Sequence, residues 1–145
     1  MGERLKRSDT DATDADPRVT LELIPGSYAL CRLTPDDGLP PWVTQGAFFS
    51  VTRTPAELSV VCDAGVVPSG VVADGPWSML AVRGPLDLKM VGVLAGLATP
   101  LATAGISIFA VSTYDTDHLL VRHDDLEKAV RVLREVGHHV TMNGD

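Results

Sequence analysis

Residues 109–121 read FAVSTYDTDHLLV, and residues 49–61 read FSVTRTPAELSVV. When the two stretches are aligned without a gap, most positions agree in character, and Glu57 falls on Asp117. Each stretch has two apolar segments around a short polar one, which is the pattern of two strands joined by a turn. We therefore predict the same hairpin at two places in the chain, each with an acidic residue at the far side of its turn.

The residues around the later hairpin predict the element order βαββαβ over 77–142. WSMLAVR begins this order as a strand, and Pro85 opens a helix that Gly105 ends in a left-handed conformation. Asp124 is expected to cap a second helix, and HHVTM forms the closing strand. The apolar stripe expected in the first helix comprises Leu88, Val91, Leu94, Ala98 and Leu101. This order is typical of an α+β, ferredoxin-like fold, in which two helices cover one face of an antiparallel sheet.

The first half of the chain is predicted to have the same order of strands, with its helices degenerate. VTLELIPGSYALCRL predicts two short strands around the turn Pro25-Gly26. The Pro- and Gly-rich residues that follow leave room for at most one helical turn before the earlier hairpin begins. We therefore predict three regions: a disordered tail at 1–17, a degenerate repeat at 18–73 and a complete domain at 74–142.

Charge and hydropathy exclude several classes of partner. The chain has 145 residues and a formal net charge of −7. Nucleic acid is not an expected partner, because neutralising phosphates requires clustered Lys and Arg side chains, which are absent beyond the tail. No apolar run reaches the roughly 18 residues that span a bilayer, and the charged N-terminus does not read as a secretory signal. We expect a cytoplasmic protein without membrane contact, in which Cys31 and Cys62 are reduced, buried thiols.

No arrangement of residues predicts catalysis. None of the four histidines stands at zinc-protease spacing from a second histidine or an acid. Ser112 lies within a strand and lacks the G-x-S-x-G turn that exposes a nucleophile. Two cysteines cannot form a four-thiolate zinc site. We expect a protein that is not an enzyme, with no catalytic residues, no metal and no cofactor.

The segment GPLDLKMVGVLAGLATPLATAGISIFAVSTYDTDHLLV, residues 84–121, resembles small bacterial proteins built from tandem ACT domains. LIPGSYALCRL and FFSVTRTPAELSVV in the first half support the resemblance, which extends over nearly everything after residue 20. The chain is similar to the CASTOR arginine-sensor branch of that superfamily. The resemblance implies ferredoxin-like ACT domains in tandem, the first of them degenerate. It also implies a regulatory homodimer or larger homo-oligomer that binds a small molecule, an amino acid, without catalysis.

In the CASTOR-like branch, the α-carboxylate of the ligand lies against backbone amides at the start of a helix, and a strand–strand turn holds the ligand's side chain. The resemblance places the amides on Val91, Gly92 and Val93. It places the turn on Thr113, Tyr114, Thr116 and Asp117. Unpaired N–H groups at a helix start attract anions, and a carboxylate such as Asp117 accepts hydrogen bonds from a cationic group. The arginine sensors carry acids where this chain has Lys89 and Met90, so the resemblance leaves the identity of the ligand open.

Other interpretations of these residues stay open. Asp117 is also a common turn former, Gly92 also permits close helix–sheet packing, and Glu57 is an echo of the later turn or a second binding group. The alternative function is a protein-interaction module whose ligand pocket has decayed, with Met90 or Tyr114 filling the crevice.

Overall fold

The computed structural model describes residues 17–36 and 38–142, so the expected tail, apart from Pro17, lies outside the described residues. The strands are β1 (Thr20–Leu33), β2 (Phe49–Arg53), β3 (Leu58–Asp63), β4 (Val72–Val82), β5 (Ile108–Ser112), β6 (Asp117–Arg122) and β7 (His139–Thr141). The α-helices of the described part are α2 (Val93–Thr103) and α3 (Leu126–Glu135). Short 3₁₀ helices are η1 (Pro41–Gln45), η2 (Ala64–Val66) and η3 (His123–Asp125).

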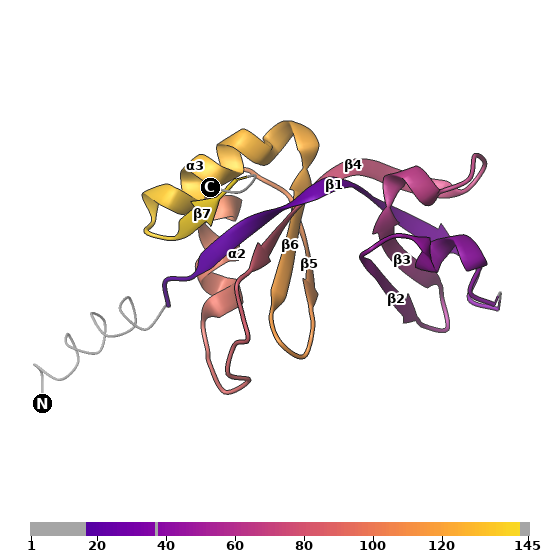
Figure 1. Cartoon of the computed structure of the whole chain (residues 1–145), viewed down its shortest axis with the longest axis horizontal. Coiled ribbons are helices and arrows are strands. Elements are labelled where there is room, and N and C mark those ends of the chain that lie inside the picture. Colours follow the sequence, from indigo (N-terminus) through magenta and orange to yellow (C-terminus); the bar gives the residue numbers. More distant parts are fainter. Residues whose placement is uncertain (1–16, 37, 143–145) are drawn as a thin grey trace, which may run out of the picture.

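All seven strands belong to one sheet, with the order β2-β3-β1-β4-β6-β5 and with β7 paired to β1. The long strands β1 and β4 cross from one half of the molecule to the other (Figure 1). They pair antiparallel from Leu21 opposite Val82 to Arg32 opposite Val72. The α+β fold with an antiparallel sheet is therefore confirmed, and the β1–β4 ladder joins the two halves of the chain.

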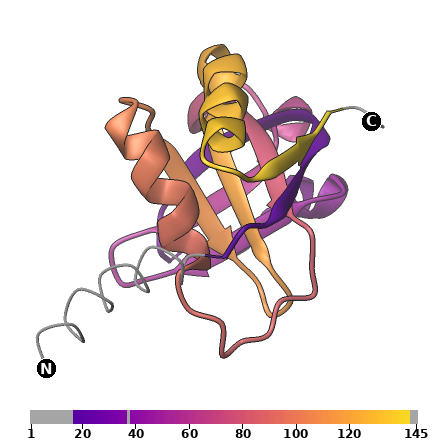
Figure 2. The same ribbon diagram turned by 90° about the vertical axis from the view of Figure 1, so that its left-hand side faces the viewer.

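The half built from residues after Trp77 has the predicted order βαββαβ. The end of β4 is followed by α2, β5, β6, α3 and β7, and both helices cover the same face of the sheet (Figure 2). Between β7 and β4 lies the start of β1, which pairs with β7 in parallel. The core under the helices is made of Leu80, Leu97, Leu101, Leu119, Leu133 and their neighbours, all buried.

The other half follows the same plan, with 3₁₀ turns in place of both helices. The end of β1 leads through η1 to β2 and β3, and η2 leads to the start of β4, so the local strand order is β4-β1-β3-β2. The predicted boundary between 73 and 74 lies inside β4, which contributes to both halves. The division into repeats 18–73 and 74–142 stays a prediction.

The prediction of two short strands around Pro25 and Gly26 was wrong. Residues Thr20–Leu33 form a single strand, because β4 pairs with β1 on both sides of the dipeptide. The register shifts between Ile24 and Tyr28, and Gly26 takes a φ of 108°, a conformation that glycine adopts without strain. The expected turn is therefore a bulge that bends a continuous strand.

The first helix begins at Val93 and not at Pro85. The side chains of Leu88 and Val91, which were expected in its buried stripe, are 68% and 76% exposed. Gly92 has a φ of 88°, which interrupts any helix that would run through it. The residues that α2 buries are Val93, Leu97 and Leu101.

The expected side-chain cap at Asp124 is also absent. Asp124 lies within η3, and α3 begins at Leu126 without a side-chain capping bond. The N–H of Leu126 donates to the carbonyl of His123, so the preceding 3₁₀ turn satisfies it. Gly105 and Gly137 follow the two helices with φ values of 78° and 103°, as predicted for residues that end helices.

The two hairpins repeat with an offset of 59 residues, not the 60 of the ungapped alignment. Arg53 faces Leu58 across the first turn, and Ser112 faces Asp117 across the second. Leu58 is therefore the counterpart of Asp117. Because side chains alternate between the two faces of a strand, this one-residue difference exchanges the faces that the alignment had paired.

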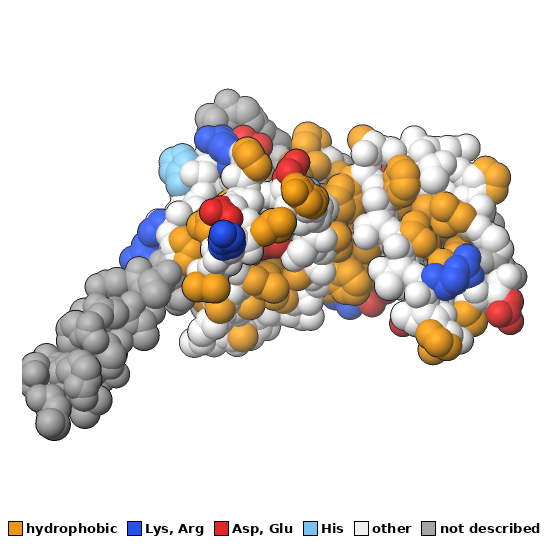
Figure 3. Space-filling model, turned by 90° about the horizontal axis from the view of Figure 1, so that it is seen from below, with side chains coloured by type: hydrophobic (Ala, Val, Ile, Leu, Met, Phe, Trp, Pro, Cys, Tyr) orange, Lys and Arg blue, Asp and Glu red, His pale blue; other side chains and the backbone are white. Residues whose placement is uncertain are grey.

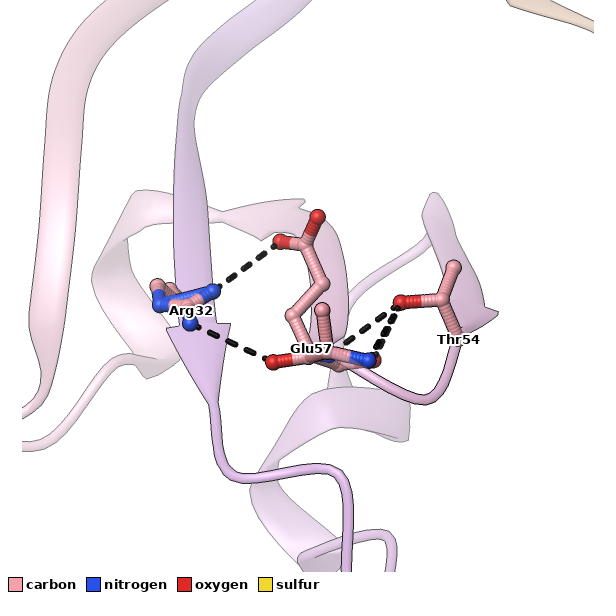
Figure 4. A network of polar contacts seen from close by, with 4 residues as sticks. Arg32, Thr54 and Glu57 are labelled. Carbon is pink, nitrogen blue, oxygen red and sulfur yellow. Dashed lines mark hydrogen bonds and ion pairs between the residues drawn. The ribbon is translucent and has the colours of Figure 1, made fainter.

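The turns themselves are alike. The N–H of Thr54 donates to the carbonyl of Glu57 over 2.9 Å, and that of Thr113 donates to Thr116 over 2.8 Å. In each turn the threonine hydroxyl oxygen also accepts the N–H of the fourth residue. Glu57 therefore corresponds to Thr116, and its carboxylate lies 3.6 Å from the guanidinium of Arg32 on β1 (Figure 4). Glu57 therefore makes a structural contact of its own and is not the structural equivalent of Asp117.

A buried histidine joins α2 to the start of β1. Pro100 has no N–H, so the carbonyl of Gly96 lacks its usual helical donor. Nε2 of His138 lies 3.0 Å from that carbonyl oxygen, and Nδ1 accepts the N–H of Val19 over 3.2 Å. Because Val19 donates to Nδ1, the proton of the neutral ring must lie on Nε2 and point at Gly96.

Replacing His138 with Ala should lower the free energy of unfolding by about 2–4 kcal/mol, because it removes a buried side chain and leaves a partly buried donor and a partly buried acceptor without partners. Urea denaturation measures this change. The matched control is His139→Ala at an exposed neighbouring position, which should stay within about 0.5 kcal/mol of the wild type. Equal losses in both variants would contradict the role assigned to His138.

Candidate functional site

Two segments meet at one end of the helix-covered half: the loop 83–92 before α2 and the β5–β6 turn 113–116. The N–H of Leu86 donates to the carbonyl of Asp115 over 2.7 Å, which fixes the loop against the turn. A Cβ atom at Gly84 would lie 3.0 Å from the same carbonyl oxygen, so a larger residue there would push the turn away. This contact draws the residues after Pro85 away from the helix that the sequence predicted.

The turn is held by side-chain hydrogen bonds. The hydroxyl of Thr116 donates to the carbonyl of Val82 at the end of β4, over 2.6 Å. The hydroxyl of Ser112 donates to Oδ1 of Asp117 over 2.6 Å. No other hydrogen bond of the Asp117 carboxylate is found in the described part of the chain, so its second oxygen is available to a ligand.

A small cleft of about 160 Å³ lies between the loop and the turn. Of the residues predicted from the sequence, those that line it are Val93, Thr113, Tyr114, Thr116 and Asp117. Val91 and Gly92 do not line the cleft. Val91 is 76% exposed on the loop, and Gly92 is the residue that precedes the first turn of α2.

Met90, which the alternative function placed in the crevice, also lines it, whereas sequence reasoning missed Leu86, Asp87, Leu88, Ser112 and Asp115. Those in the loop were missed because 85–92 was assigned to a helix, although the Gly84-Pro85 dipeptide is a loop signal. Asp87 forms a turn in which its carboxylate accepts the N–H of Lys89 over 2.9 Å. With Asp115 and Asp117, the cleft has three carboxylates and no Lys or Arg among its lining residues, so it favours a cationic group.

His118 follows Asp117 on β6 but points to the helix-free face of the sheet. Its ring centroid lies 5.0 Å from that of Phe48, and its Nδ1 is buried without a partner among the described residues. Burial lowers the pKa of His118 below its usual value, while a hydrogen bond to the backbone of Val111 and the charge of Asp117 act in the opposite direction. This histidine belongs to the packing between the halves and not to the cleft.

Within residues 17–36 and 38–142, no group of three or more His, Cys, Asp or Glu side chains is arranged to hold a metal ion. Among the same residues, none of the helices combines the length and the apolar character needed to cross a membrane.

Comparison with known proteins adds to this geometry. A family model described as ACT domain matches residues 70–135, which include the loop, α2, the β5–β6 hairpin and α3. The chain is an ACT-domain protein. A second model, of an N-terminal domain, matches residues 26–70 and so overlaps the half that lacks α-helices.

Curated relatives place this ACT-domain protein near the CASTOR branch. The cytosolic arginine sensor for mTORC1 subunit 1 of Bos taurus is 33% identical over 96 residues, which are 61% of this chain and 29% of the sensor. The human protein of the same name is 33% identical over 95 residues, which are 60% of this chain and 29% of the sensor. The ACT-domain chain thus spans less than a third of the length of these relatives.

Solved structures share its fold. The Agrobacterium tumefaciens protein Atu0741 is 41% identical, with a TM-score of 0.84 over 89% of this chain and 96% of that one. The regulatory subunit of aspartate kinase from Thermus thermophilus is 14% identical, with a TM-score of 0.61 over 83% of this chain and 99% of that one. At that identity, the second likeness shows the ferredoxin-like ACT fold alone.

The lowered pKa of His118 predicts how stability depends on pH. The unfolded chain, with a histidine pKa near 6.5, binds a proton more readily than the folded chain. The free energy of unfolding should therefore be highest above that pH, and it should fall as the pH drops through that value towards the pKa of the folded state. His118→Phe should flatten the decline in urea midpoints between about pH 7 and 5.

His139→Gln, which changes an exposed histidine, is the matched control and should keep the wild-type profile. An unaltered slope in His118→Phe would show that His118 does not carry the pH dependence.

Proposed function

We propose that this ACT-domain protein is a non-catalytic regulator that binds an amino acid in the cleft between the loop 83–92 and the β5–β6 turn. The observation that carries the proposal is the acidic cleft placed directly beside the start of an α-helix. In this arrangement a carboxylate can bind a cationic group, and unpaired amides can bind an anionic group. Together they suit a zwitterion. The arginine sensors among the relatives support an amino acid as the ligand.

In the proposed pose, the ligand's cationic group approaches Asp117 in the cleft, and its carboxylate extends towards the amides of Val91–Val93, of which Val93 lines the cleft. The first N–H groups of α2 have no partner within the helix, so they attract an anion. Gly92 carries no side chain that would block the approach. Thr113 and Thr116 then border the ligand's side chain, and Tyr114, which is 81% exposed, can close over it.

We further propose that the protein acts as a homo-oligomer. Residues 90–114 contain no charged residue, although they include α2 on the surface of the sheet. A surface helix ordinarily has a charged outer face, as α3 has with Lys128 and Arg131. The flank of α2 that faces away from α3 consists of Leu94, Ala95, Ala98 and Ala102. It lies on the side of β5, the edge strand that pairs with β6 and has no strand on its other side (Figure 2).

The mouth of the cleft supports the same conclusion. Leu88, Val91 and Tyr114 are among the most exposed large hydrophobic residues of the described chain. The face drawn in Figure 3 has hydrophobic side chains spread among few charged ones. A cleft of about 160 Å³ is smaller than the roughly 300 Å³ of typical ligand pockets, so a second surface is needed to enclose an amino acid. We propose that another copy of the chain provides this second surface.

We also propose that the protein is cytoplasmic, because the name of its relatives describes them as cytosolic.

A thermal-shift screen against the twenty amino acids identifies the ligand, because a compound that binds only the folded state raises the melting temperature. For a cationic ligand, Asp117→Asn should weaken binding about ten- to a hundredfold in calorimetry, since it removes roughly 1.5–3 kcal/mol of charge-assisted hydrogen bonding. The Ser112 hydroxyl can still donate to the Asn oxygen, so the turn should keep its stability.

Asp124→Asn, on η3 and away from the cleft, is the matched control and should bind as the wild type does. An affinity for a cationic ligand that is the same in Asp117→Asn and the wild type would exclude Asp117 from the site.

The oligomer prediction is tested at Ala102, which is exposed on the uncharged flank of α2. Ala102→Glu should reduce the mass found by light scattering towards the 15.4 kDa of a single chain, because two carboxylates would be buried at the interface. Arg131→Glu on α3 introduces the same residue on a charged face and should leave the mass unchanged. A wild-type mass of one chain at micromolar concentration would refute the oligomer.

A further inference from the structure

A groove of about 580 Å³ lies between α2 and α3 and is larger than the cleft. Its volume falls within the range of small-molecule sites, about 300–1,000 Å³. One wall is formed by Gly96, Thr99, Pro100 and Thr103 of α2, and the other by Val132, Glu135 and Val136 at the end of α3. The groove opens on the side of α2 opposite to the uncharged flank proposed for the oligomer.

The floor of the groove suits an apolar occupant. His138 lies at the bottom, and both of its ring nitrogens already have partners, at Val19 and Gly96. The same bond satisfies the carbonyl that Pro100 leaves without a helical donor. An apolar group placed between Pro100 and Val136 would therefore cover no unsatisfied polar atom of the floor.

The rim of the groove has two charges of opposite sign. Arg18 lies across the backbone of Gly137, where a Cβ atom would come within 2.3 Å of its Nε. The side chain of Arg18 therefore lies close to the residue that follows the end of α3. Glu135 stands on the same rim, one turn of helix from Val132. Within the described residues, neither Arg18 nor Glu135 has an ion-pair partner, and the two do not pair with each other.

We propose that the α2–α3 groove is a second binding site, which takes a small zwitterion with an apolar body, of the class of α-amino acids with aliphatic or aromatic side chains. Arg18 binds the carboxylate, Glu135 binds the ammonium group, and the side chain lies between Pro100 and Val136. The two sites differ in chemistry, because the cleft has three carboxylates and no basic side chain among its lining residues. The second site therefore does not depend on the function proposed for the cleft.

Calorimetry on the full chain tests the site with L-leucine, L-methionine and L-phenylalanine as probes. We expect saturable binding of at least one of them and much weaker binding of N-acetyl-L-leucine and L-leucinamide, each of which lacks one charge. Arg18→Ala and Glu135→Gln should each weaken binding about tenfold or more, as loss of a charge-assisted hydrogen bond does. Thr99→Phe, at an exposed position of the wall, should abolish binding by filling the groove.

Controls use Arg131 and Glu127 of α3, which line a neighbouring hollow and not the groove. Arg131→Ala and Glu127→Gln should bind the probe as the wild type does. Asp117→Asn should also keep this binding, so failure of the cleft proposal and failure of the groove proposal give different results.

Several outcomes would overturn the second site. One is the absence of any heat or melting shift with millimolar probe, and another is equal binding of leucine and its two derivatives. A third is loss of binding in Asp117→Asn but not in Arg18→Ala. If Thr99→Phe changes the mass in light scattering, the groove is a contact between copies and the proposal fails.

Discussion

The antiparallel pairing of β1 with β4 holds the rest of the structure in place. Each strand contributes one end to the helix-covered half and the other end to the half with 3₁₀ turns. Without β1, both β7 and the inner edge of β4 would lose their partners, and a buried row of backbone groups would be left unpaired. The two halves are therefore expected to fold as one cooperative unit and not as separable repeats.

Side chains on the two faces of this ladder enter different cores. Leu80 and Val82 pack under α2 and α3, whereas Met79, which precedes Leu80, packs on the helix-free face with Tyr28 and Leu120. The alternation follows from strand geometry, in which successive side chains point to opposite faces. It joins the halves twice, through backbone hydrogen bonds along the ladder and through apolar contacts beneath it.

The cleft is located by the same strand. β4 ends at Val82, whose carbonyl accepts the hydroxyl of Thr116, and the chain then runs through the loop that Asp115 fixes by its carbonyl. The half without α-helices has a turn of the same design, but no helix start stands beside it. The helix start beside the β5–β6 turn therefore has no counterpart in the other half. The acid of the other turn, Glu57, lies instead against Arg32.

Local pattern was sufficient for much of the second half. The apolar periodicity and the residues that end helices predicted the order βαββαβ, and the polar turns predicted both hairpins. The resemblance to the CASTOR branch, and not the local pattern, placed seven residues at the site; five of them line the cleft, and Val91 and Gly92 lie outside it. What the pattern missed depends on contacts between distant segments: the single strand through Pro25 and Gly26, and the loop before Val93.

The sequence by itself determined which residues alternate, where glycine permits a left-handed backbone and which helix lacks charge. Tertiary structure decided the 59-residue register of the hairpins, the position of Asp87 in the cleft and the pairing of His138 with Gly96. The physical reason is that periodicity records the burial of each residue but not the partner that buries it. A strand partner supplied from far along the chain can convert a turn signal into a bulge, and one backbone hydrogen bond can hold a loop where helix propensity alone would extend a helix.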